Sequence, residues 1–192
     1  MKYLSKIKTG FLENKTCLLR VDFNLEKTGA GHFRFQAVLP TIRFLLRNGA
    51  KVVIMSHRGR SKSLETVKPF APLLTRVFQR KVVFFPDFHF AKIKTGIEGS
   101  EARIFLLENL RHEKGEEENS RLFARRLASL GDLYVNDALG VSHRSHASVE
   151  AITQFIPSMA GLLLEKEVKN LEKIRQKTAH PFVVILGGAK TS

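Results

Sequence analysis

The sequence predicts an α/β fold: a three-layer, Rossmann-like parallel sheet with helices on both faces. Short apolar runs rich in β-branched and aromatic residues recur along the chain, and they are continuous rather than alternating, as in strands that are covered on both sides. Segments with helical spacing separate several of these runs, so strand and helix alternate. The 192 residues, 43% of them hydrophobic, suffice for one domain with a buried core and part of a second.

Six apolar runs are the predicted strands. In chain order they cover residues 17–21, 51–55, 82–85, 103–107, 133–135 and 182–186. Parallel strands joined by right-handed crossovers have their carboxyl ends at one edge of the sheet, and ligands of such folds bind outside that edge. Residues that directly follow these runs are therefore candidates for a functional site.

Four segments are predicted to be helical. Residues 36–47 place apolar side chains on one side, Asn48-Gly49 ends the helix, and we expect Pro40 to lie near its first turn, where a missing N–H costs least. The spacing of apolar residues predicts helices over 70–78 and 123–130, and a solvated helix over 165–177. The dense charge run at 113–118 is predicted to be a solvated loop.

The composition narrows the class of protein. Thirty-two Lys and Arg against 18 Asp and Glu give a net charge of +14, which favours an anionic partner: nucleic acid, a membrane surface or a phosphorylated small molecule. The single cysteine, Cys17, excludes an intramolecular disulfide and a Cys-rich metal site and fits a reducing compartment. Residues 1–15 contain no apolar stretch of secretory length, and no window approaches a membrane span. We therefore expect a cytoplasmic protein without membrane association.

Polar residues crowd after four of the predicted strands. They lie at 22–24, 56–60, 108–112 and 136–146. Arginine and histidine predominate over carboxylates there, as a small polyanion with a phosphate and a carboxylate would require. For any single arginine, a surface ion pair is the alternative. Asp22 and Asn24 point to the same face of their strand and suit recognition of a hydroxyl group, with capping of the following loop as the alternative.

Two further patterns bear on metal and phosphate binding. His143 and His146 have i, i+3 spacing, but no matching third ligand is evident, so no tightly bound metal is predicted. The segment Gly187-Gly188-Ala189-Lys190 does not match a P-loop, because Ala189 precedes the lysine. A Gly-Gly turn after an apolar strand and before a lysine still indicates backbone that approaches a phosphate.

A set of motifs, in order along residues 15–192, resembles the N-terminal half of the phosphoglycerate kinase family. The motifs are Arg20-Val-Asp22-Phe-Asn24, Ala37-Val-Leu-Pro40, Ser56-His57-Arg58-Gly59-Arg60, Leu107-Glu-Asn-Leu-Arg111, Val135-Asn-Asp-Ala-Leu-Gly140-Val-Ser-His143-Arg144-Ser-His146, and Ile185-Leu-Gly-Gly-Ala-Lys190. Arg58 stands where the family more commonly has leucine.

The resemblance implies a role for each matched residue. Asp22 and Asn24 would meet the hydroxyl and carboxylate side of the glycerate, Arg34 would be the catalytic arginine, and Lys190 would meet the transferred phosphate beside Gly187 and Gly188 at the nucleotide. The 3-phosphate would be held by a basic set, with His143 and Gly59 in support; that set consists of His57, Arg60, Arg111 and Arg144.

The resemblance also implies the domain organisation and partners. A phosphoglycerate-binding domain would cover 1–163, an interdomain helix 164–178, and the first strand and Gly-Gly-Ala-Lys turn of a truncated nucleotide domain 179–192. The activity would be reversible phosphoryl transfer in glycolysis, with Mg-ATP or Mg-ADP held mostly by the absent C-terminal domain. We expect a monomer without turnover of its own. A basic module that binds nucleic acid is the rival interpretation, and an inert remnant is a third.

Overall fold

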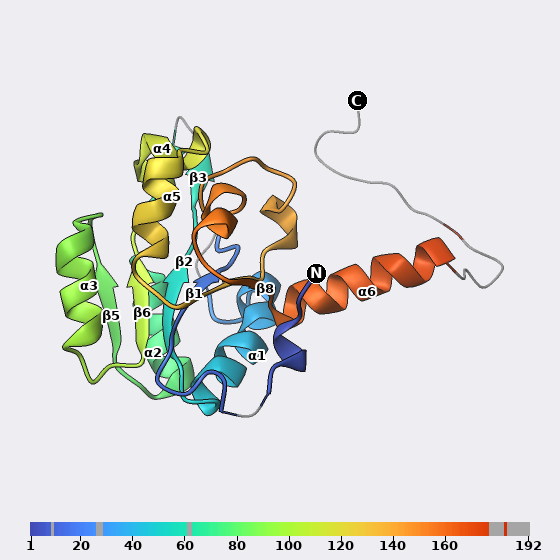
Figure 1. Ribbon diagram of the computed structural model, residues 1–192, viewed down its shortest axis with the longest axis horizontal. Coiled ribbons are helices and arrows are strands. Elements are labelled where there is room, and N and C mark those ends of the chain that lie inside the picture. Colours follow the sequence, from blue (N-terminus) through green and yellow to red (C-terminus); the bar gives the residue numbers. More distant parts are fainter. Residues whose placement is uncertain (9, 26–28, 61–62, 177–182, 184–192) are drawn as a thin grey trace.

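The computed structural model describes residues 1–8, 10–25, 29–60, 63–176 and 183, and for Arg60, Ser63 and Leu64 it describes the backbone only. Figure 1 shows a sheet with helices on both sides, from which one helix, α6, extends outward. The predicted strand at 182–186 and the segment containing Gly187, Gly188 and Lys190 lie outside the described residues, except for Val183.

The main sheet has six parallel strands in the order β5-β6-β2-β1-β7-β8. Their bounds are β1 Thr16–Arg20, β2 Lys51–Met55, β5 Val82–Phe85, β6 Ile104–Leu107, β7 Leu133–Asn136 and β8 Ser158–Ala160. The first five confirm the predicted strands to within one residue at either end. Arg20, the last residue of the central strand β1, pairs with Met55 on one side and Asn136 on the other. The carboxyl ends of these three strands therefore lie together.

Helices cover both faces of the sheet, which confirms the three-layer fold. On one face, α1 (Phe33–Arg47) and α2 (Phe70–Phe78) pack on Leu19, Val52 and other residues of one core cluster. On the opposite face, α3 (Phe90–Glu98) and α5 (Arg121–Ala128) pack on Leu18 and Val53. Adjacent strand residues thus belong to opposite cores, as the continuous apolar runs require. Within the described ranges, no helix has the length and apolarity needed to cross a membrane.

Helix α1 begins three residues earlier than predicted. The His32 side chain accepts a hydrogen bond from the Arg34 amide at the helix start. Pro40 consequently lies inside the helix rather than in its first turn, and the predicted placement is wrong. Its ring nitrogen carries no proton, so the carbonyl of Gln36 lacks its usual helical partner. The end of the helix is as predicted, with Gly49 at φ +81° directly after Asn48.

The charge run at 113–118 contains a short helix, α4 (Lys114–Glu117), and the predicted solvated loop is wrong. Glu116 has no exposed surface, and its carboxylate accepts hydrogen bonds from the amide and the hydroxyl of Ser148. A charge pattern in the sequence could not show this partner because it lies 32 residues further along the chain.

The remaining elements are short. Strands β3 (Gly59–Arg60) and β4 (Ser63–Leu64) form an antiparallel hairpin. Four 3₁₀ turns occur at Leu4–Lys6, Leu110–His112, Leu139–Val141 and Ala151–Gln154.

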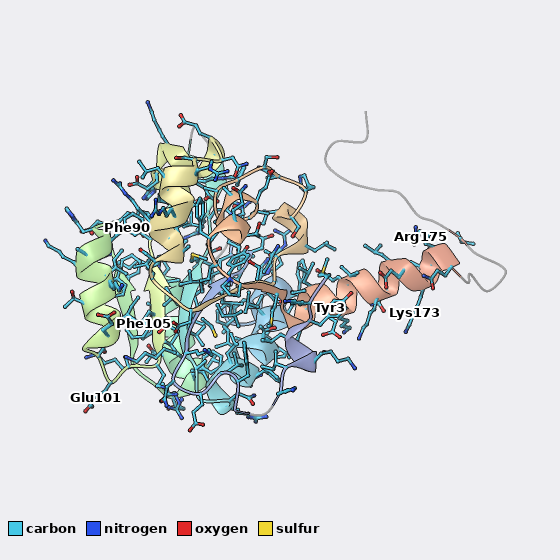
Figure 2. All side chains as sticks on the ribbon, viewed as in Figure 1. Tyr3, Phe90, Glu101, Phe105, Lys173 and Arg175 are labelled. Atoms are coloured by element: carbon cyan, nitrogen blue, oxygen red, sulfur yellow. The ribbon has the colours of Figure 1, made fainter. Side chains whose placement is uncertain are left out.

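Helix α6 spans Leu162–Gln176 and begins at the edge of the sheet. Its first amides are bound by side chains of other elements: Leu162 N donates to Thr41 Oγ1 at 3.2 Å, and Leu164 N donates to Asp137 Oδ1 at 3.0 Å. Figure 2 shows Tyr3 beside the near part of this helix and Lys173 and Arg175 at its far end, away from the body.

Candidate anion-binding site

The carboxyl ends of β1, β2, β6 and β7 bring the predicted site residues to one edge of the sheet. Asp22 and Asn24 follow β1, His57 and Gly59 follow β2, Arg111 follows β6, and residues 137–146 follow β7. Ser56 joins the first two segments, because its hydroxyl accepts from the Phe23 amide at 2.9 Å and donates to the Val21 carbonyl at 2.9 Å. The side chain of Arg60 is outside what the structure describes, as are Gly187, Gly188 and Lys190.

Asp22, Asn24 and Arg34 form one group. Asp22 Oδ1 accepts from the Asn24 amide at 3.0 Å, and Asp22 Oδ2 pairs with Arg34 Nη1 at 3.1 Å. Phe23 between them is buried and stacks on Phe70, so Asp22 and Asn24 share the partly exposed side as the alternation predicts. The loop-capping contact expected as the alternative is therefore present together with a polar group that faces solvent.

A cavity of about 280 Å³ adjoins this group. Its lining includes Asp22, Arg34 and Gly140 together with Asp137 and Glu167 near the start of α6. Arg34 is 44% exposed and can leave its contact with Asp22 for a more strongly anionic group.

Gly59 joins Asn24 to Arg111 through its backbone. The Gly59 amide donates to Asn24 Oδ1 at 3.0 Å, and its carbonyl accepts from Arg111 Nη1 at 2.7 Å. Its φ of +83° lies in the left-handed region that glycine adopts without strain. Arg58, the neighbouring residue, points elsewhere: its guanidinium pairs with Glu65 at 2.8 Å and donates to the Leu25 carbonyl.

Arg111 is a buried cation whose hydrogen bonding is incomplete. Its side chain is 4% exposed, and Nε pairs with Glu117 Oε1 at 3.0 Å. Nε and Nη2 are both buried and have no hydrogen-bond partner among the described residues; Glu117 compensates Nε by charge alone, and Nη2 has no ion-pair partner there. Burial lowers the pKa of Arg111, opposed by Glu117 and reinforced by Arg144 and Arg20. Because an arginine remains charged in a protein, Nη2 requires an acceptor that an anionic ligand could supply.

His57 faces the same cluster as a neutral imidazole. Burial, followed by the charges of Arg20, Arg111 and Arg144, lowers its pKa to about 2. Arg20 Nη2 lies 3.2 Å from His57 Nδ1. Because a guanidinium can only donate, Nδ1 is the acceptor and the ring proton resides on Nε2. His57 can therefore donate a hydrogen bond from Nε2 without carrying a charge.

His143 and Arg144 are exposed beside these groups. The guanidinium of Arg144 makes no hydrogen bond or ion pair within the described ranges, and its charge lowers the pKa of both His57 and Arg111. His146 turns instead toward Glu116, with 3.8 Å between Nδ1 and Oε1. In the part of the chain that the structure describes, no three His, Cys, Asp or Glu side chains group as metal ligands.

Sequence reasoning missed three buried polar residues behind the cluster: Arg20, Glu116 and Ser148. Arg20 lies within an apolar run that the sequence predicts to be a strand. A charged residue inside a run predicted to be covered on both faces was the available signal, because such a residue requires buried partners.

Comparison with known proteins shows which family this chain matches. The family model described as phosphoglycerate kinase matches residues 7–192. The phosphoglycerate kinase of Coprothermobacter proteolyticus is 40% identical over 198 residues, which cover 98% of this chain and 50% of that protein. That of a Wolbachia strain from Drosophila simulans is 45% identical over 188 residues, covering 94% and 47%.

Solved structures give the same result. The crystal structure of phosphoglycerate kinase from Pyrococcus horikoshii matches with a TM-score of 0.86 and 32% identity, over 99% of this chain and 49% of that one. The enzyme from Coxiella burnetii matches with a TM-score of 0.77 and 29% identity. The chain spans about half the length of the relatives it matches.

Proposed function

The chain belongs to the phosphoglycerate kinase family, and on that premise we propose that it binds 3-phosphoglycerate and 1,3-bisphosphoglycerate at the basic cluster. The cluster would be the acceptor site of reversible phosphoryl transfer between 1,3-bisphosphoglycerate and ADP, the glycolytic reaction that yields 3-phosphoglycerate and ATP. The unpaired, buried Nη2 of Arg111 is the observation that carries the proposal, since a phosphate oxygen would complete its hydrogen bonding.

The residue types around Arg111 suit a phosphate. His57 would donate from Nε2, the exposed guanidinium of Arg144 has no partner among the described residues, and Arg60 would join them from the β3–β4 hairpin. His143 would support the cluster from beside Arg144. Such an arrangement combines two kinds of donor, charged and neutral, around one trianionic ligand.

Asp22 and Asn24 would bind the glycerate end of the ligand. Asn24 Oδ1 already accepts from Gly59, which leaves its amide nitrogen available to a substrate oxygen. Asp22 Oδ1 and Oδ2 accept from Asn24 and Arg34, and each retains a lone pair for a hydroxyl group.

Chemistry at this site would require no general base. A glycerate carboxylate has a reference pKa of about 3.5 and is ionised at neutral pH, so its oxygen can attack phosphorus directly. Catalysis then consists of positioning and of charge stabilisation on the transferring phosphoryl group. Arg34, which adjoins the 280 Å³ cavity and is held by the ion pair with Asp22 and a 3.3 Å hydrogen bond to the Asn24 carbonyl, would swing from Asp22 to those oxygens.

The nucleotide would be held mostly by the absent C-terminal domain. By resemblance, Gly187, Gly188 and Lys190 would contribute from this chain, and the described residues contain no group of three metal ligands. When bound, the magnesium of Mg-ATP or Mg-ADP would neutralise charge on the phosphates. We propose the division at 163 and 178, with α6 as the interdomain helix, and a monomeric cytoplasmic parent protein whose turnover needs the second half.

Calorimetric titration of the 192-residue chain with 3-phosphoglycerate tests the proposal. We expect binding that Arg144→Ala weakens about tenfold, the effect of losing one charge-assisted hydrogen bond of ~1.4 kcal/mol. Arg126→Ala is the matched control, because Arg126 is equally exposed but lies on α5. Absence of binding to the folded wild-type chain would contradict the proposal.

Equal weakening by both variants would favour the rival interpretation, a general attraction of polyanions by the charge of +14. A duplex oligonucleotide titrated in parallel separates the two, because its affinity would fall steeply with salt and depend on many lysines and arginines.

A further inference from the structure

We propose that Glu116 and Ser148 are positioning residues of the anion-binding site. They hold Arg20, and Arg20 in turn keeps His57 in the one tautomer that presents an Nε2 proton to the ligand. The identity of that ligand rests on the proposed function; the tautomer does not.

The first step is the pairing of Glu116 with Ser148. Ser148 N donates to Oε2 at 2.9 Å, and Ser148 Oγ donates to Oε1 at 2.6 Å. Both carboxylate oxygens therefore serve one residue. Neither residue has exposed surface, so water does not compete for these bonds. The single hydroxyl proton of Ser148 is committed to Glu116.

Ser148 in turn orients the guanidinium of Arg20. Because its proton points to Glu116, Ser148 Oγ can only accept, and Arg20 Nε donates to it at 3.0 Å. The guanidinium plane is thereby set, and Nη1 donates to the Val21 carbonyl. Nη2 is left to donate to His57 Nδ1 at 3.2 Å. Arg20 therefore donates in both directions, to Ser148, which donates in turn to Glu116, and to His57 Nδ1.

Charge and packing support the same assignment. Arg20 is 1% exposed, and Glu116 is the carboxylate that compensates its charge through the serine. Tyr134 Oη donates to the Ser148 carbonyl at 2.7 Å, and the Ala147 amide donates to the Glu116 carbonyl at 2.9 Å, so both partners are held in place. His146 adds a weaker contact to Glu116 at 3.8 Å.

The short helix α4 thus serves two ligand-facing groups. Glu116 acts on His57 through Ser148 and Arg20, and the next residue, Glu117, pairs directly with Arg111. The titratable groups that act on His57 are basic ones: Arg20, Arg111, Arg144 and His146. Without the bond from Arg20, the imidazole could carry its proton on Nδ1. Nε2 would then present a lone pair to the anion, and the two would repel each other.

Nitrogen-15 NMR of the histidine rings in the ligand-free 192-residue chain tests the proposal. In the wild type we expect His57 to show one protonated nitrogen, Nε2, between pH 6 and 8. In Ser148→Ala we expect the two ring nitrogens to shift toward each other as a second tautomer becomes populated, and binding of 3-phosphoglycerate to weaken about fivefold to tenfold. Ser158→Ala is the control, because that hydroxyl bonds only to the Ile156 carbonyl, and it should change neither.

A purely structural role would leave the tautomer unchanged. If Ser148→Ala folds, judged by its amide spectrum and Tm, and His57 keeps its wild-type nitrogen shifts, the proposal is wrong. If Ser148→Ala does not fold, the isosteric Glu116→Gln is measured in the same way. Failure of both variants to fold would also overturn the proposal, because the two side chains would then serve folding rather than positioning. A wild-type chain that shows the expected tautomer but no affinity for 3-phosphoglycerate would contradict only the proposed function.

Discussion

Arg111 and His57 are both buried at the carboxyl end of the sheet, but they differ in charge. Arg111 keeps its charge and leaves Nε and Nη2 without a hydrogen bond among the described residues, whereas His57 is neutral because it is buried and three arginines lie near it. The cluster can therefore attract an anion without a further positive charge being buried beside Arg20 and Arg111. A fully protonated cluster would repel itself in the absence of ligand.

The neutral state of His57 should be visible in acid stability. Its pKa is about 2 in the folded chain against an ordinary 6.5. The unfolded chain therefore binds a proton below pH 6.5 that the folded chain does not, and stability is lost as pH falls. The slope is about 1.4 kcal/mol per pH unit from this group. Urea unfolding between pH 6 and 4.5 measures how the free energy of unfolding changes with pH. We expect His57→Gln to remove the part of this slope that His57 contributes. An unchanged slope would contradict a neutral His57 in the folded chain.

Gly161 should tolerate no side chain. A Cβ there would lie 2.3 Å from Asp137 Oδ1 and 2.8 Å from Asp137 Cβ, so Asp137 and the start of α6 would have to move. We expect Gly161→Ala to lower the free energy of unfolding by about 3 kcal/mol. Gly31→Ala, where a Cβ meets nothing within 4 Å, is the control and should have little effect in the same thermal unfolding experiment.

At this scale, prediction from sequence succeeded where position in the chain implies position in space. Asp22, His57 and Arg111 could be placed because each directly follows a strand. Glu116 and Ser148 could not, because their contact joins segments 32 residues apart, and Arg20 meets Ser148 across 128 residues. Charged residues near one another in a sequence carry no information about such partners.

Among the elements, α1 contains a proline where a helix is ordinarily weakened. Pro40 is exposed and lies in the helix interior, so its replacement by alanine would restore an amide that can donate to Gln36. We expect Pro40→Ala to raise the free energy of unfolding by about 1 kcal/mol, after allowing for greater freedom of the unfolded chain.

Pro72 offers the matched control. It is the third residue of α2, where an amide has no helical acceptor in any case. Pro72→Ala should therefore not stabilise the chain. Stabilisation by both substitutions, or by neither, would show that the missing amide at Pro40 is not the cause.

The start of α6 should respond to pH through Asp137. Burial raises the pKa of this carboxyl from 3.8 to about 6, opposed by hydrogen bonds from Thr41, Leu164 and Leu163. Between these values the folded chain holds a proton that the unfolded chain lacks, so stability falls as pH rises from about 4 to 6, by roughly 3 kcal/mol.

Asp137→Asn should remove this particular decline, measured by urea unfolding from pH 4 to 8. Asn Oδ1 can still accept from Leu164, so the helix start is retained. Asp87→Asn, in which the residue is exposed, is the control. A decline that persists unchanged in Asp137→Asn would assign the effect to other groups.

Element prediction failed where elements are short or depend on distant contacts. Strand β8 has three residues and the hairpin strands have two each, too few for a periodic pattern. The five longer strands and α2 were predictable because continuous apolar runs and i, i+3, i+4 spacing extend over four or more residues. The start of helix α1 differs from the prediction because Pro40 lies in the helix interior rather than in the first turn.

For the whole molecule, the net charge of +14 should dominate the response to salt. Five ion pairs are found in the described part of the chain, so most basic residues there have no acidic partner. We expect Tm to rise when sodium chloride increases from 10 to 200 mM (roughly a fivefold shorter screening length), because self-repulsion is screened. A falling Tm would show that local ion pairs outweigh the net repulsion.

The edge of the sheet is completed by residues from opposite ends of the described chain. Lys2 O accepts from the Ala160 amide at 2.9 Å, and Tyr3 forms a parallel bridge to Ala160. During synthesis on a ribosome, these first residues emerge before the segment that they pair with has been translated. The sheet can close at this edge only after residue 160 has left the exit tunnel, so the start of the chain must wait, unpaired, for nearly the whole domain to appear.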